Sequence, residues 1–134
     1  MLAGEDGLVT LFEIAQLVVR ILLAVVFVGM GAMHFVPGPS RGMAAMIPPA
    51  LRVVSPRAIV AFTGLCELAG GIGLLVPAIR VAAAICLVVF LVAVFPANAY
   101  AAGKTERFGA FATPLVPRAI LQVVLIALCV FCAL

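Results

Sequence analysis

The residue with the clearest chemical potential in this chain is a single acidic side chain inside an apolar segment. Glu67 lies near the middle of a segment that runs from about residue 58 to 76. If that segment crosses a membrane, a central carboxyl group costs about 2.5 to 3.5 kcal/mol, so it must face the protein interior and be paired or protonated. A proton relay is the function that such a group favours. The structural alternative is an ion pair that fixes helix packing.

Other polar residues lie in the neighbouring apolar segments. Arg20 and His34 are separated by two seven-residue steps, which places them on one face of a helix. Arg118 and Gln122 are four residues apart and share a face of the last segment. Asn98 closely follows a proline, which frees a backbone carbonyl. Each has a structural alternative: interfacial hydrogen bonding for His34, snorkelling for Arg118 and helix capping for Asn98.

The depths of these residues predict one polar pocket. We expect Glu67 and His34 to be its catalytic residues, and Arg20 to point either toward Glu67 or outward to lipid headgroups. The residues expected to bind a ligand are Arg118, Gln122 and Asn98, with Arg20 at lower weight.

The cysteines give a weaker signal. Cys129 and Cys132 have the spacing of a redox motif, but a regular helix holds positions i and i+3 awkwardly for a disulfide. Cys66 and Cys86 are interpreted as packing residues. With 1 His and 4 Cys in the chain, we expect no intrinsic metal or haem centre.

Composition identifies the elements that must position these residues. The chain has 134 residues, 67% of them hydrophobic and 10% charged, whereas soluble domains carry about 25% charged residues. Lipid must therefore solvate most of the surface. The net charge of +3 is scattered, which argues against nucleic acid. We predict one all-α domain over residues 1–134, a bundle of four transmembrane helices at about 17–36, 58–76, 81–100 and 114–134.

We also predict the structure of two segments outside the four helices. Residues 8–16 could form an amphipathic helix at the membrane interface, and the acidic residues before them argue against a cleaved signal peptide. The apolar residues 43–47 predict a lid or a short re-entrant turn within the connection 37–57.

Basic residues predict the orientation. With four spans, the two loops after the first and third helices lie on one side, and the positive-inside rule places those loops in the cytoplasm and both termini outside. The basic residues in or beside these loops are Arg41, Arg52, Arg57, Lys104, Arg107 and Arg118.

The order of these features resembles the DoxX-like family of small four-helix membrane proteins. The matching segments are RILLAVVFVGMGAMHF from Arg20 to Phe35, GLCELAGGIGLLVP from Gly64 to Pro77, FPAN from Phe95 to Asn98, and PRAILQ from Pro117 to Gln122. The resemblance implies a multi-pass protein of the bacterial inner membrane, associated with redox complexes. The chain has no recognisable flavin, haem or iron–sulfur motif, so electrons would need a partner redox subunit or a diffusible quinone.

Three functions fit these features. The leading one is a redox-associated subunit that binds a quinone or similar lipophilic molecule, with Glu67 as proton relay. The second is a non-enzymatic assembly or scaffold protein whose polar core fixes the bundle. The third is an isomerase of a hydrophobic substrate in which Glu67 shuttles a proton, an idea that rests on analogy of fold. Small residues on the first two helices also allow a homo-oligomer.

Overall fold

The computed structural model describes residues 2–104, 107 and 114–134. Over these residues the chain forms helices and no strand, which confirms the all-α prediction. The elements are α1 (Leu2–Met33), α2 (Pro37–Met46), the short 3-10 helix η1 (Pro49–Leu51), α3 (Pro56–Gly73), α4 (Arg80–Ala101) and α6 (Leu115–Ala133).

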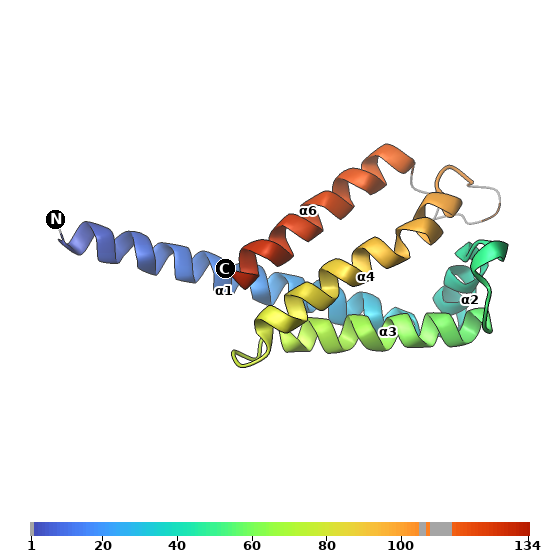
Figure 1. Cartoon of the computed structure of the whole chain (residues 1–134), viewed down its shortest axis with the longest axis horizontal. Coiled ribbons are helices and arrows are strands. Elements are labelled where there is room, and N and C mark those ends of the chain that lie inside the picture. Colours follow the sequence, from blue (N-terminus) through green and yellow to red (C-terminus); the bar gives the residue numbers. More distant parts are fainter. Residues whose placement is uncertain (1, 105–106, 108–113) are drawn as a thin grey trace.

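The long helices form an antiparallel bundle in which α3 packs against both α1 and α4. In Figure 1, α3 runs beside α1 and next to α4, and α1 extends well beyond the end of the bundle. The C-terminal end of α6 packs against α1, where Gln16 Nε2 donates a hydrogen bond to the Phe131 carbonyl at 3.0 Å. The Phe12 and Phe131 rings meet edge to face at a centroid distance of 5.4 Å. At the opposite end, α2 packs against α3 and α4.

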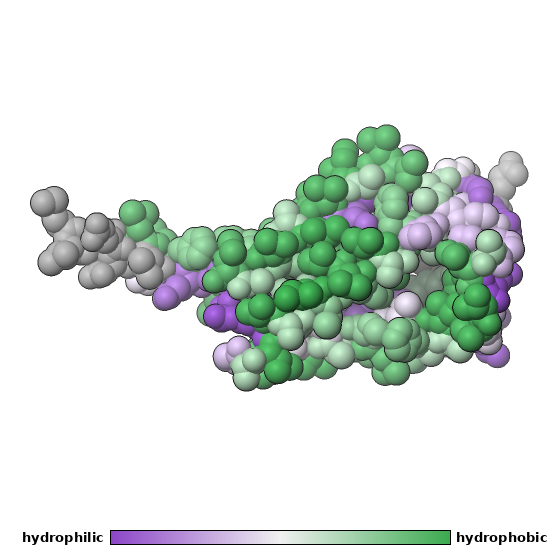
Figure 2. Space-filling model, viewed as in Figure 1, coloured by the Kyte–Doolittle hydropathy of each residue, from purple (hydrophilic) through white to green (hydrophobic). Residues whose placement is uncertain are grey.

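Within the part of the chain that the structure describes, three helical segments are long and apolar enough to cross a membrane: Thr10–Met33, Arg80–Ala101 and Leu115–Ala133. Figure 2 shows hydrophobic surface along the bundle and hydrophilic surface mainly toward its ends, as expected for helices in contact with lipid. The structure thus supports membrane association but not the predicted count of four spans. Helix α3 is less apolar because its 18 residues include Arg57, Glu67 and four glycines.

Glycines let α3 contact two helices at once. A Cβ atom at Gly71 would lie 3.1 Å from the Phe27 Cβ of α1. On another face of α3, a Cβ at Gly70 would lie 2.5 Å from Leu87 Cδ2, and one at Gly73 would lie 2.8 Å from the Ala83 Cβ of α4. These glycines therefore serve close helix packing, as small residues commonly do in membranes.

Two segments differ in form from what the sequence predicted. Residues 8–16 do not form a separate interfacial helix, because α1 continues through them from Leu2 to Met33. The connection 37–57 contains the helix α2, which begins at Pro37, since proline is tolerated in a first helical turn. With η1, α2 covers the end of the bundle at which α1 ends (Figure 1), where a lid or a re-entrant turn was expected.

Candidate functional site

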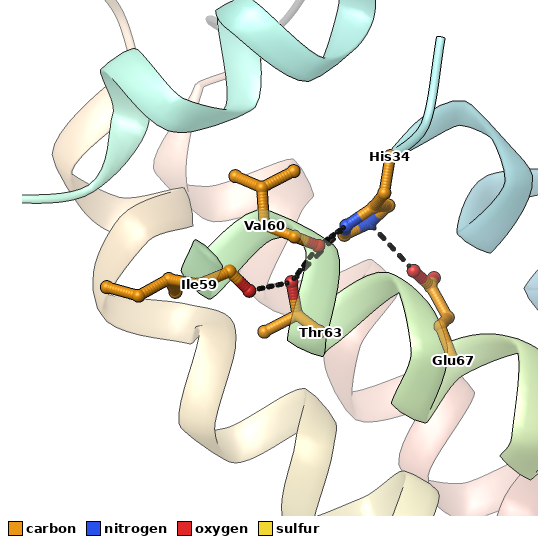
Figure 3. A network of polar contacts seen from close by, with 5 residues as sticks. All are labelled: His34, Ile59, Val60, Thr63 and Glu67. Carbon is orange, nitrogen blue, oxygen red and sulfur yellow. Dashed lines mark hydrogen bonds and ion pairs between the residues drawn. The ribbon is translucent and has the colours of Figure 1, made fainter. Parts of the chain in front are cut away.

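The central feature of the site is a contact between the residue that follows α1 and the middle of α3. His34 Nε2 lies 2.9 Å from Glu67 Oε2, and the two side chains are only 11% and 9% exposed. Figure 3 shows the His34 ring between Glu67 on one side and Val60 and Thr63 on the other. The structure thus buries Glu67 and pairs it, as its place in an apolar segment requires.

Hydrogen-bond geometry determines where the proton of the imidazole lies. His34 Nδ1 is 2.8 Å from the Val60 carbonyl oxygen, and a carbonyl oxygen can only accept. Nδ1 therefore carries hydrogen. The contact between Nε2 and Oε2 then needs one further proton, held either by the imidazolium or by the carboxylic acid. In both arrangements the pair has zero net charge, which suits a low-dielectric environment.

Thr63 completes the network around the ring. Its Oγ1 lies 3.3 Å from His34 Nδ1 and can accept a share of that N–H. The single hydroxyl proton of Thr63 is donated back into α3, to the Ile59 carbonyl at 2.9 Å or the Val60 carbonyl at 3.0 Å. The imidazole is thereby held in one orientation with Nε2 directed at Glu67 (Figure 3).

Glycines bring the two helices close enough for this contact. A Cβ atom at Gly64 would lie 2.6 Å from the His34 Cβ. One at Gly31 would lie 3.1 Å from the Gly64 carbonyl oxygen and 2.9 Å from the Leu68 Cγ. The His34–Glu67 pair therefore depends on the absence of side chains at both glycines.

The predicted ligand-binding residues form a second polar contact at the same end of the bundle. Arg118 Nη1 in the first turn of α6 donates a hydrogen bond to Asn98 Oδ1 near the end of α4 at 3.1 Å. Gln122 lies one turn further along α6, is half-buried and makes no hydrogen bond within the described part of the chain.

Arg20 does not belong to this end. It precedes His34 by fourteen residues on α1, which corresponds to about 21 Å along the helix axis. Its side chain instead lines a groove with Arg80, near the start of α4. The structure therefore does not place Arg20 beside Glu67, which was one of the two orientations considered.

The cysteines of α6 lie in the apolar core. Cys129 and Cys132 are free thiols that are 0% and 1% exposed. They pack with Phe27, Leu74 and Leu87, at the opposite end of α6 from Arg118. Among the described residues, no group of three His, Cys, Asp or Glu side chains is placed to hold a metal ion.

Sequence reasoning missed two partners of the imidazole, Thr63 and the carbonyl oxygen of Val60. A signal for Thr63 was present, because it lies four residues before Glu67 and so shares its helix face. The role of a backbone carbonyl carries no sequence signal.

Comparison with known proteins gives a family but no described function. Neither a curated protein nor a solved structure is significantly similar to the chain. Residues 23–133 match a family described as a domain of unknown function, DUF8561, and this match includes both polar contacts at the α2 end but not Arg20. Because the match covers most of its length, the chain belongs to the DUF8561 family.

Proposed function

We propose that the chain is a membrane protein of four spans, with α3 as the fourth. Helix α1 ends and α4 begins at opposite ends of the bundle (Figure 1), so α3 must return the chain through the same layer. Its 18 residues extend about 27 Å, close to the hydrocarbon thickness of about 30 Å. We further propose that the basic end, which includes Arg41 and Arg57, faces the cytoplasm.

Within that arrangement, we propose that the protein binds a quinone or a similar lipophilic carbonyl compound and supplies it with protons. The observation that carries this proposal is the 2.9 Å contact between His34 Nε2 and Glu67 Oε2, which contains one transferable proton. Reduction of a quinone to a quinol consumes two electrons and two protons. The electrons would come from a partner redox subunit, because the chain has no recognisable redox cofactor motif.

The residues around the pair support a role in proton delivery. Val60 and Thr63 hold the imidazole with Nε2 toward the carboxyl group, so a proton can pass between Nε2 and Oε2 without rotation of the ring. At the same end of the bundle, Arg118 and Gln122 offer N–H donors suited to ring carbonyls. The proposed relationship to DoxX-like proteins agrees with this assignment, since those proteins are associated with redox complexes.

One observation favours a second function, an assembly or scaffold protein. His34 uses both of its ring nitrogens within the protein, and little of the ring is exposed. A pair satisfied in this way could serve only to lock α1 against α3. The two functions differ in whether a lipophilic molecule is bound and in whether Glu67 is needed for more than folding.

The deciding experiment measures quinone in folded protein. Protein purified in mild detergent is extracted with organic solvent, and quinone is quantified by mass spectrometry for wild type, Glu67→Gln and the control Cys66→Ala. Cys66 is the neighbour of Glu67 on α3 and has no part in the polar network. A short-chain quinone analogue is then titrated into each delipidated protein.

We expect wild type and Cys66→Ala to carry about one quinone per chain and Glu67→Gln to bind the analogue at least about tenfold more weakly, as loss of a charge-assisted hydrogen bond predicts. Equal binding by folded Glu67→Gln would contradict the proton-relay assignment. If none of the three proteins binds quinone, the scaffold function is favoured.

A further inference from the structure

A groove at the other end of the bundle has no role in the proposed chemistry. It lies between α1, the start of α4 and the C-terminal residue that follows α6, with a volume of about 600 Å³. Its charged lining consists of Arg20, Arg80 and Glu13, and its apolar lining includes Phe12, Leu17 and Leu134. In Figure 2, hydrophilic surface is visible where α1 leaves the bundle.

The groove contains a guanidinium group with unused hydrogen-bonding capacity. Arg20 Nη1 is buried and has no hydrogen-bond partner among the described residues. Buried polar groups are nearly always hydrogen-bonded, and an unmet donor on a charged group is especially costly. By contrast, Arg52 and Arg118 donate to the Ile47 carbonyl oxygen and the Asn98 amide oxygen. The unpaired Nη1 therefore points to a missing acceptor in the groove.

The charge of the groove indicates an anionic acceptor. The charged side chains of the lining are two guanidinium groups and one carboxylate, that of Glu13, so the side chains carry an excess of positive charge. Guanidinium groups bind phosphate oxygens well because their N–H groups form a planar fork.

The surroundings of the groove favour a lipid over a free anion. The groove lies where α4 begins and α6 ends, at the level of the membrane–water boundary in the proposed arrangement (Figure 1). Exposed apolar side chains continue from it along α1, among them Val18 and Ile21. A phosphate group held by the arginines would therefore have its acyl chains against a surface that already requires lipid.

We propose that this groove binds one anionic phospholipid through its headgroup phosphate, with Arg20 and Arg80 as the phosphate ligands. The acyl chains lie against the apolar side of α1, beside Leu17. This site is independent of the His34–Glu67 pair, so either assignment can fail without the other.

The test is titration of delipidated protein in detergent, with bound lipid counted by native mass spectrometry. The probes are phosphatidylglycerol, phosphatidylcholine and inorganic phosphate. The variants are Arg20→Gln and Arg80→Gln. Arg41→Gln and Arg57→Gln serve as matched controls, because both remove an exposed arginine at the other end of the bundle.

We expect one phosphatidylglycerol to bind wild type at least about tenfold more tightly than phosphatidylcholine, and Arg20→Gln and Arg80→Gln each to weaken it by roughly tenfold. The control variants should keep wild-type binding. Equal losses in the controls would show a general charge effect and overturn the site. Displacement of the lipid by inorganic phosphate at equal concentration would overturn the lipid assignment. If Arg20→Gln does not fold, the loss of lipid binding by Arg80→Gln alone still tests the proposal.

Discussion

The two ends of the bundle differ in whether their charged side chains have partners within the protein. At the end where α1 meets α2, His34 pairs with Glu67 and Arg118 with Asn98. At the other end, Arg20 shares a groove with Arg80 and has a buried Nη1 without a hydrogen-bond partner in the described structure. The two pairs at the first end lie within contact distance inside the protein, whereas Arg20 Nη1 at the other end has no acceptor among the described residues.

Because of this difference, substitutions at one end should change the stability of the fold, and substitutions at the other end should change ligand binding. Removing one member of an internal pair leaves its partner buried and unmet, so the folded state loses free energy. Removing a group that has no internal partner should not lower the stability of the isolated protein. The loss should be measurable only as weaker binding of the ligand that supplies the acceptor. Substitutions at the two ends should therefore differ in which measurement they change.

The largest effect is expected from breaking the buried pair on one side only. His34→Leu leaves Glu67 without its partner and should lower the free energy of unfolding by about 3 kcal/mol or more. The double variant His34→Leu/Glu67→Leu should recover much of this loss, because no buried carboxyl group remains. Unfolding by denaturant in detergent micelles measures both. A double variant as unstable as the sum of the two single variants would show that the residues are not coupled.

The next largest effect is expected from pushing the two helices apart. Gly64→Ala places a Cβ atom 2.6 Å from the His34 Cβ, and the resulting overpacking should cost about 1 to 3 kcal/mol. Gly29→Ala is the matched control, since its Cβ would meet no atom within 4 Å. Thermal unfolding should separate the two variants clearly. The same midpoint for both would mean that α1 and α3 do not depend on this close approach.

A smaller loss is expected at the second polar contact. Asn98→Ala removes the acceptor of the Arg118 hydrogen bond and should cost about 1 kcal/mol, because both residues are only half-buried. Gln122→Ala removes another half-buried amide, one that has no hydrogen-bond partner among the described residues, and should change stability by less than about 0.5 kcal/mol. Denaturant unfolding compares them. A larger loss for Gln122→Ala would reverse the order of importance.

The smallest effect on stability is expected in the groove. Without lipid, Arg20→Gln should not lower the free energy of unfolding, because Arg20 Nη1 has no hydrogen bond among the described residues to lose. Added phosphatidylglycerol should then raise the unfolding temperature of wild type but not that of the variant, since a ligand stabilises only the state that binds it. A variant that is strongly destabilised in the absence of lipid would mean that Arg20 has an internal structural role.

The sequence predicted well which polar side chains are buried, but it predicted poorly which of them face one another. The burial of Glu67 followed from one acidic residue in an apolar segment. The sequence did not predict which residue pairs with Glu67, because Arg20 and His34 share a helix face. Their different positions along α1 determine that His34, and not Arg20, contacts Glu67. The single predicted pocket combined residues by depth alone, whereas the rotation of each helix about its axis decides which side chains meet.

The start of α1 and the helix α2 differ from the prediction because of features of the local sequence. Glycines and acidic residues interrupt the apolar pattern before residue 17, yet α1 extends to Leu2, since a helix needs only its own backbone hydrogen bonds to continue. Pro37, Gly38 and Pro39 indicated an irregular connection, but the first proline occupies the first position of α2.

The glycine-lined faces of α3 have an evolutionary consequence. A Cβ atom at Gly64 would lie 2.6 Å from the His34 Cβ, and one at Gly73 would lie 2.8 Å from the Ala83 Cβ of α4, so a larger residue at either position must displace the neighbouring segment. Phe62, Leu65 and Ile72 of the same helix are exposed and can exchange for other apolar residues at little cost. Among relatives of this chain, the exposed side of α3 should therefore vary freely, whereas Gly64 and Gly73 should change very slowly.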